Sequence, residues 1–163
     1  MQDDQVELNG KRVIVVEDDY LLATGLCSDF RSLGATVLGP APTPFYALQL
    51  IGNKERRKLD AAVLDVHLHG TTVFDVADVL RQRGVPFVFA TGSEPTAIPK
   101  RFEDAPVLQK PFERSTVVQA VIKVMHRPAP RQQKLSFPPT NLASGPPVVQ
   151  FARALARALL GGQ

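Results

Sequence analysis

Five short apolar runs constrain the fold of this chain more than any other feature of its sequence. They are Val13–Val16, Thr36–Leu38, Ala61–Leu64, Phe87–Ala90 and Val107–Leu108. None of them alternates polar with apolar residues, as a strand with one face in water would. Strands that are buried on both faces read in this way, and they are typical of parallel sheets covered by helices. The runs therefore predict a parallel sheet with helices on both sides.

The segments between these runs have apolar residues at helical spacing. One helical face is made of Leu22, Leu26, Phe30 and Leu33, and Gly34 follows as a stop signal. Further helices are predicted around Tyr46 and Leu50, ending in the charged stretch "NKERRK", from Val73 to Leu80 with Gly84 as the stop, and from Thr116 to Met125. In the fourth interval, Pro95 and Pro99 permit only a short helix, which we expect to start at Pro99.

Strands that alternate with helices through right-handed crossovers predict a doubly wound, five-stranded parallel α/β sheet over about residues 10–126. Periodicity alone does not give the order of its strands. Residues 127–147 contain six prolines and no helical period, which indicates an extended linker. Residues 148–160 carry one apolar stripe and predict a short amphipathic helix. Because such a helix is marginally stable alone in water, we expect it to dock on another surface.

Composition and charge argue against several classes of protein. No apolar run approaches about 18 residues, and the N-terminal "MQDDQVELNG" lacks a basic and then apolar leader, so we expect neither secretion nor membrane spanning. The single cysteine, Cys27, suggests a buried thiol and a reducing compartment, the cytoplasm. Six of the 19 Lys and Arg residues follow residue 122, which leaves 13 bases against 16 acids before it. The body is therefore mildly acidic, and only the tail leaves nucleic-acid binding open.

Chemically active side chains follow four of the five predicted strands. The first strand ends in Glu17, Asp18 and Asp19, the third in Asp65, the fourth in Thr91 and the fifth in Lys110. Ligands of an open parallel sheet bind beyond the carboxyl ends of its strands. We therefore expect these side chains to meet at one edge of the sheet.

The carboxylates of Glu17, Asp18 and Asp65 would repel one another unless a cation lay among them. Hard oxygen ligands with open positions favour Mg²⁺, which also holds phosphate oxygens. A carboxylate beside such an ion can attack a phosphoryl group and form an acyl phosphate, while Lys110 offsets charge on the phosphoryl oxygens. For Asp19 we expect a plainer role as the N-cap of the helix that begins near Tyr20.

Four motifs, "VVEDD", "AAVLDV", "FVFATG" and "LQKPF", stand in this order and at these spacings in the chain. Together they resemble the receiver domain of two-component response regulators over about residues 10–126. The resemblance implies a (βα)5 flavodoxin-like architecture with strand order 2-1-3-4-5. "FATG" further resembles a subgroup of stand-alone receivers of alphaproteobacteria, although Ser93 stands where an aromatic residue commonly follows the glycine.

By this resemblance, Asp65 is the phosphate acceptor, Thr91 the switch hydroxyl and Lys110 the lysine of the site. The Lys110–Pro111 bond resembles the cis peptide of the family, which aims the lysine inward. The implied phosphoryl donor is a phosphohistidine on a sensor histidine kinase or a histidine phosphotransfer protein. Many receivers carry Tyr or Phe three residues before the lysine as the reporter of phosphorylation, and Val107 stands there instead. We therefore expect the short fourth helix to move on phosphorylation.

For the metal, the resemblance implies Mg²⁺ held by the acidic pair Glu17 and Asp18, by Asp65, and by the backbone carbonyl of His67. Of the acidic pair, Asp18 is the one expected to bind the ion directly. His67 and His69 could also suggest a zinc site, but no third ligand is in view, and we interpret both as solvated loop residues.

These residues predict a single-domain response regulator, a phosphoacceptor that catalyses only its own phosphorylation and dephosphorylation. The 37 residues after residue 126 are too few for a DNA-binding output domain, so we expect signalling through an unidentified downstream protein. Pairing with a second copy of the chain is left open. The alternative is a phosphorylation-independent protein-binding module with receiver architecture. Val107 and the short fourth helix favour it, whereas the intact acidic pair, Asp65, Thr91 and Lys110 argue against it. A Mg²⁺-dependent phosphohydrolase is disfavoured because His67 stands where such enzymes commonly carry a second Asp.

Overall fold

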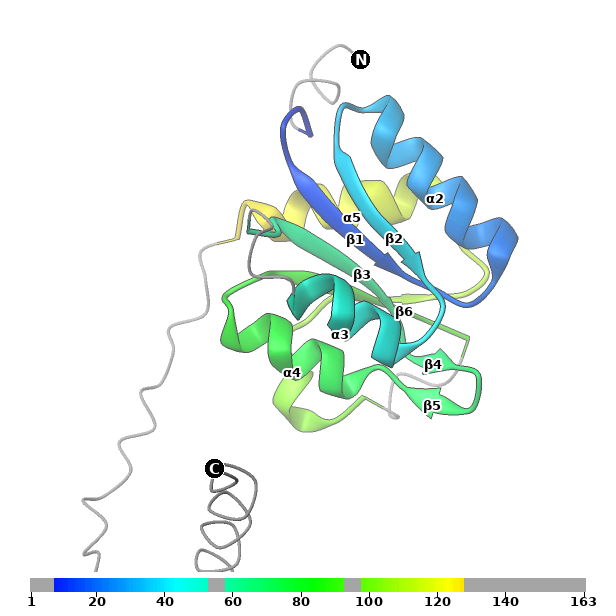
Figure 1. The fold of residues 1–163 in the computed structure, drawn as a ribbon, viewed down its shortest axis with the longest axis vertical. Coiled ribbons are helices and arrows are strands. Elements are labelled where there is room, and N and C mark those ends of the chain that lie inside the picture. Colours follow the sequence, from blue (N-terminus) through cyan, green and yellow to red (C-terminus); the bar gives the residue numbers. More distant parts are fainter. Residues whose placement is uncertain (1–7, 53–57, 93–97, 128–163) are drawn as a thin grey trace, which may run out of the picture. The chain divides into compact units, whose positions relative to one another are not determined.

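The computed structural model describes residues 8–52, 58–92 and 98–127, in which five parallel strands form one sheet (Figure 1). The strands are β1 (Arg12–Val16), β2 (Thr36–Ala41), β3 (Ala61–Asp65), β6 (Phe87–Thr91) and β7 (Val107–Gln109). Their order across the sheet is β2-β1-β3-β6-β7. This confirms the five predicted strands and the order 2-1-3-4-5 implied by the resemblance. The order reverses between β1 and β3, which is where an open sheet of this kind binds ligands.

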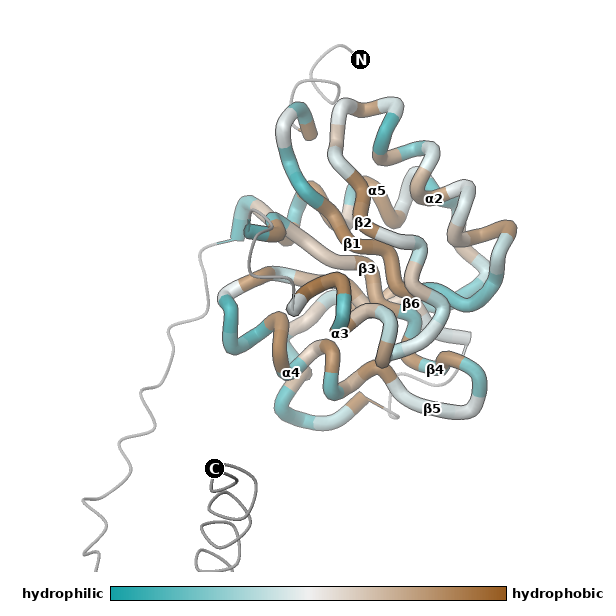
Figure 2. The backbone as a smooth tube through the Cα atoms, in the orientation of Figure 1, coloured by the Kyte–Doolittle hydropathy of each residue, from teal (hydrophilic) through white to brown (hydrophobic). Residues whose placement is uncertain are grey.

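Within the described residues, four α-helices cover the sheet, two on each face. They are α2 (Tyr20–Ser32), α3 (Pro44–Gly52), α4 (Phe74–Gln82) and α5 (Arg114–Met125). The helices α2 and α5 pack on one face, and α3 and α4 pack on the other (Figure 1). Every residue of β3 and β6 is buried between these layers, which explains why neither strand alternates polar with apolar residues. In Figure 2 the hydrophobic stretches accordingly run through the sheet, β1 among them.

The fourth crossover, as far as the structure describes it, is a single turn of 3₁₀ helix, η2 (Lys100–Phe102), preceded by Pro99. This agrees with the prediction of a short helix at Pro99. The ring of Phe102 is fully buried, and its centroid lies 5.6 Å from that of Phe89 and 5.8 Å from that of Phe74. Arg101 also pairs with Asp78 of α4 at 3.0 Å, so aromatic packing and an ion pair both hold this turn on the body.

A small antiparallel hairpin follows β3, where the sequence predicted only a loop. Its strands are β4 (His67–Leu68) and β5 (Thr71–Thr72), and Leu68 is opposite Thr71. The two residues between them, His69 and Gly70, have φ angles of 47° and 81°. Two consecutive positive φ angles are the signature of a type I′ turn, the tight turn that suits a two-residue hairpin. Strands of two residues are too short to show a periodic pattern, which is why the prediction was wrong here.

Gly39 makes an irregularity in β2 that reaches the end of β1. The pairing register of β1 with β2 shifts between Ile14 and Val16, and Gly39 has a φ angle of 96°. Beyond the shift, the backbone N–H of Glu17 donates to the carbonyl of Ala41 at 3.0 Å. The glycine therefore lets β2 follow the end of β1 and fix the backbone of its first acidic residue.

Some predictions fall outside the described residues. They concern the charged end of the second helix at 53–57, Ser93 and Pro95, the linker beyond residue 127, and the amphipathic helix at 148–160. Among the described residues, no helix is both long enough and apolar enough to cross a membrane.

The space around Gly39 predicts a specific sensitivity to substitution. A Cβ at this position would lie 2.8 Å from the carbonyl oxygen of Val15 and from the backbone nitrogen of Ala41. We expect Gly39→Ala to lower the free energy of unfolding by roughly 3 kcal/mol, because a left-handed φ and two backbone clashes add up. Urea unfolding of the full chain measures this.

Gly84→Ala is the matched control, because Gly84 has a φ angle of 66° but nothing within 4 Å of its added Cβ. This substitution should lower the free energy of unfolding by only about 1 kcal/mol, because only the left-handed backbone conformation of the alanine is unfavourable. Equal losses in the two variants would show that the contacts around Gly39 do not matter.

Candidate functional site

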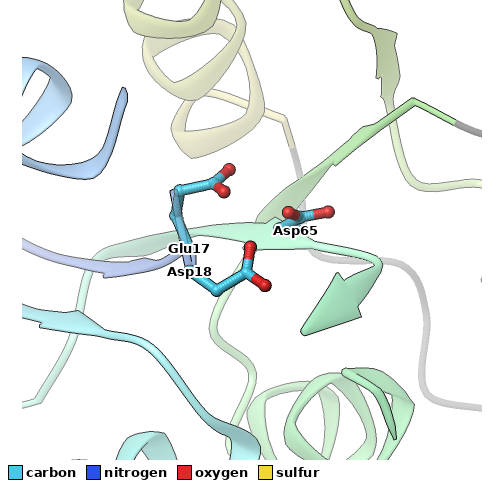
Figure 3. A group of neighbouring side chains, drawn as sticks. All are labelled: Glu17, Asp18 and Asp65. Atoms are coloured by element: carbon cyan, nitrogen blue, oxygen red, sulfur yellow. The ribbon is translucent and has the colours of Figure 1, made fainter. Parts of the chain in front are cut away.

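The carboxylates of Glu17, Asp18 and Asp65 meet at the carboxyl ends of β1 and β3. One oxygen from each side chain lies within 4.8 Å of the others, and Figure 3 shows the three side chains gathered at this edge. Their meeting follows from the register, since Val16 is opposite Leu64 and each next residue is therefore a neighbour across the two strands. The expected convergence of these strand ends is confirmed.

Lys110 completes this cluster from the far end of the chain. Its Nζ lies 3.0 Å from Oε2 of Glu17 and 3.0 Å from Oδ2 of Asp65. The residue directly follows β7, and its backbone N–H donates to the carbonyl of Thr91 at 2.8 Å. The Lys110–Pro111 peptide is cis, as the resemblance implied. One ammonium group is thus shared by two carboxylates.

Thr91 is the last residue of β6, the strand that lies between β3 and β7. Its side chain is buried, and its backbone neighbour Ala90 is opposite Asp65 in the ladder. The structure therefore brings a hydroxyl, an ammonium group and three carboxylates to one edge of the sheet.

Burial determines the electrostatics of this cluster. Glu17 is 2% exposed and Asp65 5% exposed, so both carboxylates lie almost entirely out of water. Burial raises the pKa of Glu17 from 4.5 to about 7, and the charge of Asp65 adds to this, while hydrogen bonds from Asp19 and Lys110 oppose it. Burial opposes the charge of Lys110, but its bonds to Glu17 and Asp65 outweigh this and raise the lysine pKa.

The cluster carries more negative than positive charge, and it fits a hard divalent cation. Lys110 bonds only two of the three carboxylates, and the oxygens of all three are close enough to bind a common ion. Carboxylate oxygens are the ligands that Mg²⁺ and Ca²⁺ take in proteins. Asp18 is the most accessible of the three, with its side chain 23% exposed. A cation from solvent can therefore reach the group at Asp18.

Asp19, the third acid of the run, caps a helix and is not part of the group of three carboxylates. Its Oδ1 accepts a hydrogen bond from the backbone N–H of Leu22 at 3.0 Å, so it is the N-cap of α2. Its own backbone N–H donates to Oε1 of Glu17 at 3.0 Å. The predicted capping role is confirmed, and the cap also holds the neighbouring carboxylate in place.

The two histidines of the β4–β5 hairpin have different surroundings. The backbone N–H of His67 donates to Oδ1 of Asp65 at 3.2 Å, and His67 itself is exposed. His69 donates to Oδ2 of Asp18 twice, from its backbone N–H at 3.0 Å and from Nδ1 of its ring at 2.7 Å. His69 is exposed in the turn, as the sequence predicted, but its ring also bonds Asp18, a contact that the prediction did not include. The pair His69-Gly70 is a sequence signal for a tight turn, at a position that favours Asn, Asp or Gly, but it does not point to Asp18.

The solved structures that are similar to this chain include the following three. SdrG from Sphingomonas melonis Fr1 is 36% identical over 69% of this chain and 96% of its own, with a TM-score of 0.57. The receiver domain of the response regulator PhyR from Erythrobacter litoralis is 28% identical over 74% and 95%, with a TM-score of 0.62. The BeF3-activated conformation of SdrG from Pseudomonas melonis Fr1 is 34% identical over 77% and 99%, with a TM-score of 0.56. No protein-family model matches the chain, and no curated protein does.

The raised pKa of Glu17 predicts a pH dependence of the metal-free protein. Because the folded state favours the protonated side chain, it binds more protons than the unfolded state between pH 4.5 and about 7. The contribution of Glu17 to stability is therefore present below pH 4.5 and declines as the pH rises to about 7. Glu17→Gln should remove this decline. Urea unfolding in EDTA across this window measures it.

Glu103→Gln is the control, since Glu103 is exposed in the turn after η2. The free energy of unfolding of Glu103→Gln should change with pH in the same way as that of the unsubstituted chain. If the unsubstituted chain and Glu17→Gln changed in parallel from pH 4.5 to 7, Glu17 would have its ordinary pKa.

Proposed function

This chain belongs to the response regulator receiver family, and we propose that it is a single-domain response regulator that accepts a phosphoryl group on Asp65. The observation that supports this most is the pairing of Asp65 with Lys110 at the switch point of the sheet, beside two further carboxylates. A buried carboxylate next to a fixed cation is poised to act as a nucleophile toward phosphorus.

In the proposed reaction, an oxygen of Asp65 forms a bond to the phosphorus of a phosphohistidine. The P–N bond breaks, and its electron pair leaves with the imidazole of the donor protein. Lys110 offsets the charge on the phosphoryl oxygens, since its Nζ already lies 3.0 Å from Asp65. In this proposal Thr91, buried at the end of the neighbouring strand, hydrogen-bonds a phosphoryl oxygen afterwards.

Glu17, Asp18 and Asp65, with the backbone carbonyl of His67, are the proposed ligands of Mg²⁺. When bound, the ion would neutralise the carboxylates and the incoming phosphoryl oxygens. Binding of Mg²⁺ would account for three acids gathered at this edge, two of which also pair with Lys110.

The donor we propose is a sensor histidine kinase or a histidine phosphotransfer protein, and the output is contact with a downstream protein in the cytoplasm. Residues 10–126 form the receiver domain in this proposal, followed by the linker 127–147 and the helix 148–160. The activity is limited to the phosphorylation and dephosphorylation of the protein itself.

A phosphorylation-independent binding module is the second candidate, and Val107 is the observation that favours it. This residue pairs with Phe89 of β6 and packs against the core on the side of α3 and α4. A small aliphatic side chain in this place offers no ring that could turn between two positions. In the leading proposal, the conformational response passes instead through η2, whose Phe102 contacts Phe89.

The acceptor assignment predicts a loss of labelling. With Mg²⁺ and ³²P-labelled acetyl phosphate, the unsubstituted chain should take up label and Asp65→Asn should fall to background. Removal of Mg²⁺ by EDTA should have the same effect. Asp60→Asn is the matched control, because Asp60 precedes the same strand, β3, at the opposite edge and bonds the backbone of Arg12. Undiminished labelling of Asp65→Asn would refute the assignment.

The two candidate functions differ in their response to beryllofluoride. SdrG has a BeF3-activated conformation, and we expect BeF3⁻ with Mg²⁺ to act on this chain at Asp65. Amide resonances of Thr91 and of η2 should shift in the unsubstituted chain and in Asp60→Asn, and should stay in place in Asp65→Asn. Shifts confined to Asp65 and its hydrogen-bonded neighbours, with η2 unchanged, would favour the phosphorylation-independent module.

A further inference from the structure

His69 adopts an unusual backbone conformation directly beside the acidic cluster. Among the described residues it is the only one other than glycine with a positive φ angle, 47°. A residue with a Cβ is strained in this region by about 1–2 kcal/mol, and Asn, Asp and Gly are the residues that usually take such turn positions. A strained residue at the edge of a site is a reason to ask what its side chain does there.

The side chain of His69 is committed to one oxygen of Asp18. Its ring Nδ1 lies 2.7 Å from Oδ2 of Asp18, and the backbone N–H of the same residue donates to the same oxygen at 3.0 Å. The carboxylate can only accept, so Nδ1 carries the proton. Burial opposes ionisation of Asp18, but the bonds and charge of His69 outweigh it and lower the pKa of this carboxyl. The 51 residues between the partners make this a tertiary contact, not a local one.

The hairpin gives His69 a firm support. Leu68 is fully buried in the core, and its carbonyl accepts a hydrogen bond from Oγ1 of Thr71 at 2.8 Å across the turn. At the base of the hairpin, the backbone N–H of Val73 donates to the carbonyl of Val66 at 3.1 Å. Val66 directly follows Asp65, so the turn that carries His69 is tied to the strand that carries the proposed acceptor.

We propose that His69 is a positioning residue, which holds Oδ2 of Asp18 so that the other oxygen, Oδ1, is left for the cation. This proposal rests on the proposed function, because it concerns the same metal site. Carboxylate ligands are commonly oriented by a hydrogen bond to the oxygen that does not bind the metal, and loss of such a partner weakens metal binding about 10- to 100-fold.

The geometry argues against two other roles of the ring. Among the described residues, the group of donors close enough to share an ion consists of Glu17, Asp18 and Asp65, and His69 is outside it. This disfavours direct coordination. The ring is also 63% exposed, and so it lies at the rim of the site and does not fill the space between the carboxylates.

The test compares His69→Gly with His69→Asn in the full chain. Both replacements accept a positive φ angle, so the hairpin can form in each. His69→Gly removes the ring donor. His69→Asn keeps an N–H donor, because its Nδ2 is joined to Cγ just as Nδ1 is in histidine. Isothermal titration with MgCl₂ gives the affinity, and thermal unfolding in EDTA checks that the fold is retained.

We expect His69→Gly to bind Mg²⁺ about 10-fold more weakly and His69→Asn to recover most of this loss. Equal affinity in His69→Gly and the unsubstituted chain would overturn the proposal, and so would tighter binding, which would mean that the ring obstructs the ion. If the unsubstituted chain bound no Mg²⁺ at all, the metal site of the proposed function would fail as well, so the two failures are distinguishable.

A second readout does not depend on affinity. In the Mg²⁺-saturated chain, a long-range ¹H–¹⁵N spectrum of the histidine rings should show His69 with its proton on Nδ1. An Nδ1 that lost its proton on saturation would show that the ring itself binds the ion, and would overturn the positioning role.

Discussion

Glu17 and Asp65 lie almost fully buried at one edge of the sheet, and the ammonium group of Lys110 lies 3.0 Å from an oxygen of each. Two carboxylates without such a partner would destabilise the fold, because neither has water to solvate its charge. With one lysine shared between them and Asp18 beside them, the charge is only partly balanced. The lysine therefore offsets part of the cost of burying these carboxylates, and the remaining carboxylate charge fits a divalent cation.

The surrounding elements each fix one part of this arrangement. Parallel pairing of β1 with β3 brings the acids together, and the irregularity of β2 at Gly39 lets Ala41 bond the backbone of Glu17. The cap at Asp19 bonds Glu17 from the start of α2. The β4–β5 hairpin bonds Asp18 through the backbone and the ring of His69. The side chains of the site are thus fixed by contacts from several elements, as the proposed chemistry at Asp65 requires.

Much of this could be predicted because its signals are local. A strand buried on both faces must be apolar throughout, so β3 and β6 were visible as unbroken runs. An Asp before a helix is a good cap, so Asp19 could be assigned from its position alone. The hairpin could not be found in this way, because two-residue strands have no period. The contact of His69 with Asp18 could not be predicted either, since nothing in the sequence around His69 points to Asp18.

The sequence alone determined the alternation of strands and helices, the place where each strand ends, and the types of side chain that follow it. These depend on hydrophobic periodicity and on stop signals that act within a few residues. Which oxygen each donor reaches depends on the tertiary structure: Lys110 bonds both Glu17 and Asp65, and His69 bonds Asp18. Such pairings join residues 45 to 93 positions apart, and they depend on strand register and turn geometry, which are set by the packing of the whole sheet.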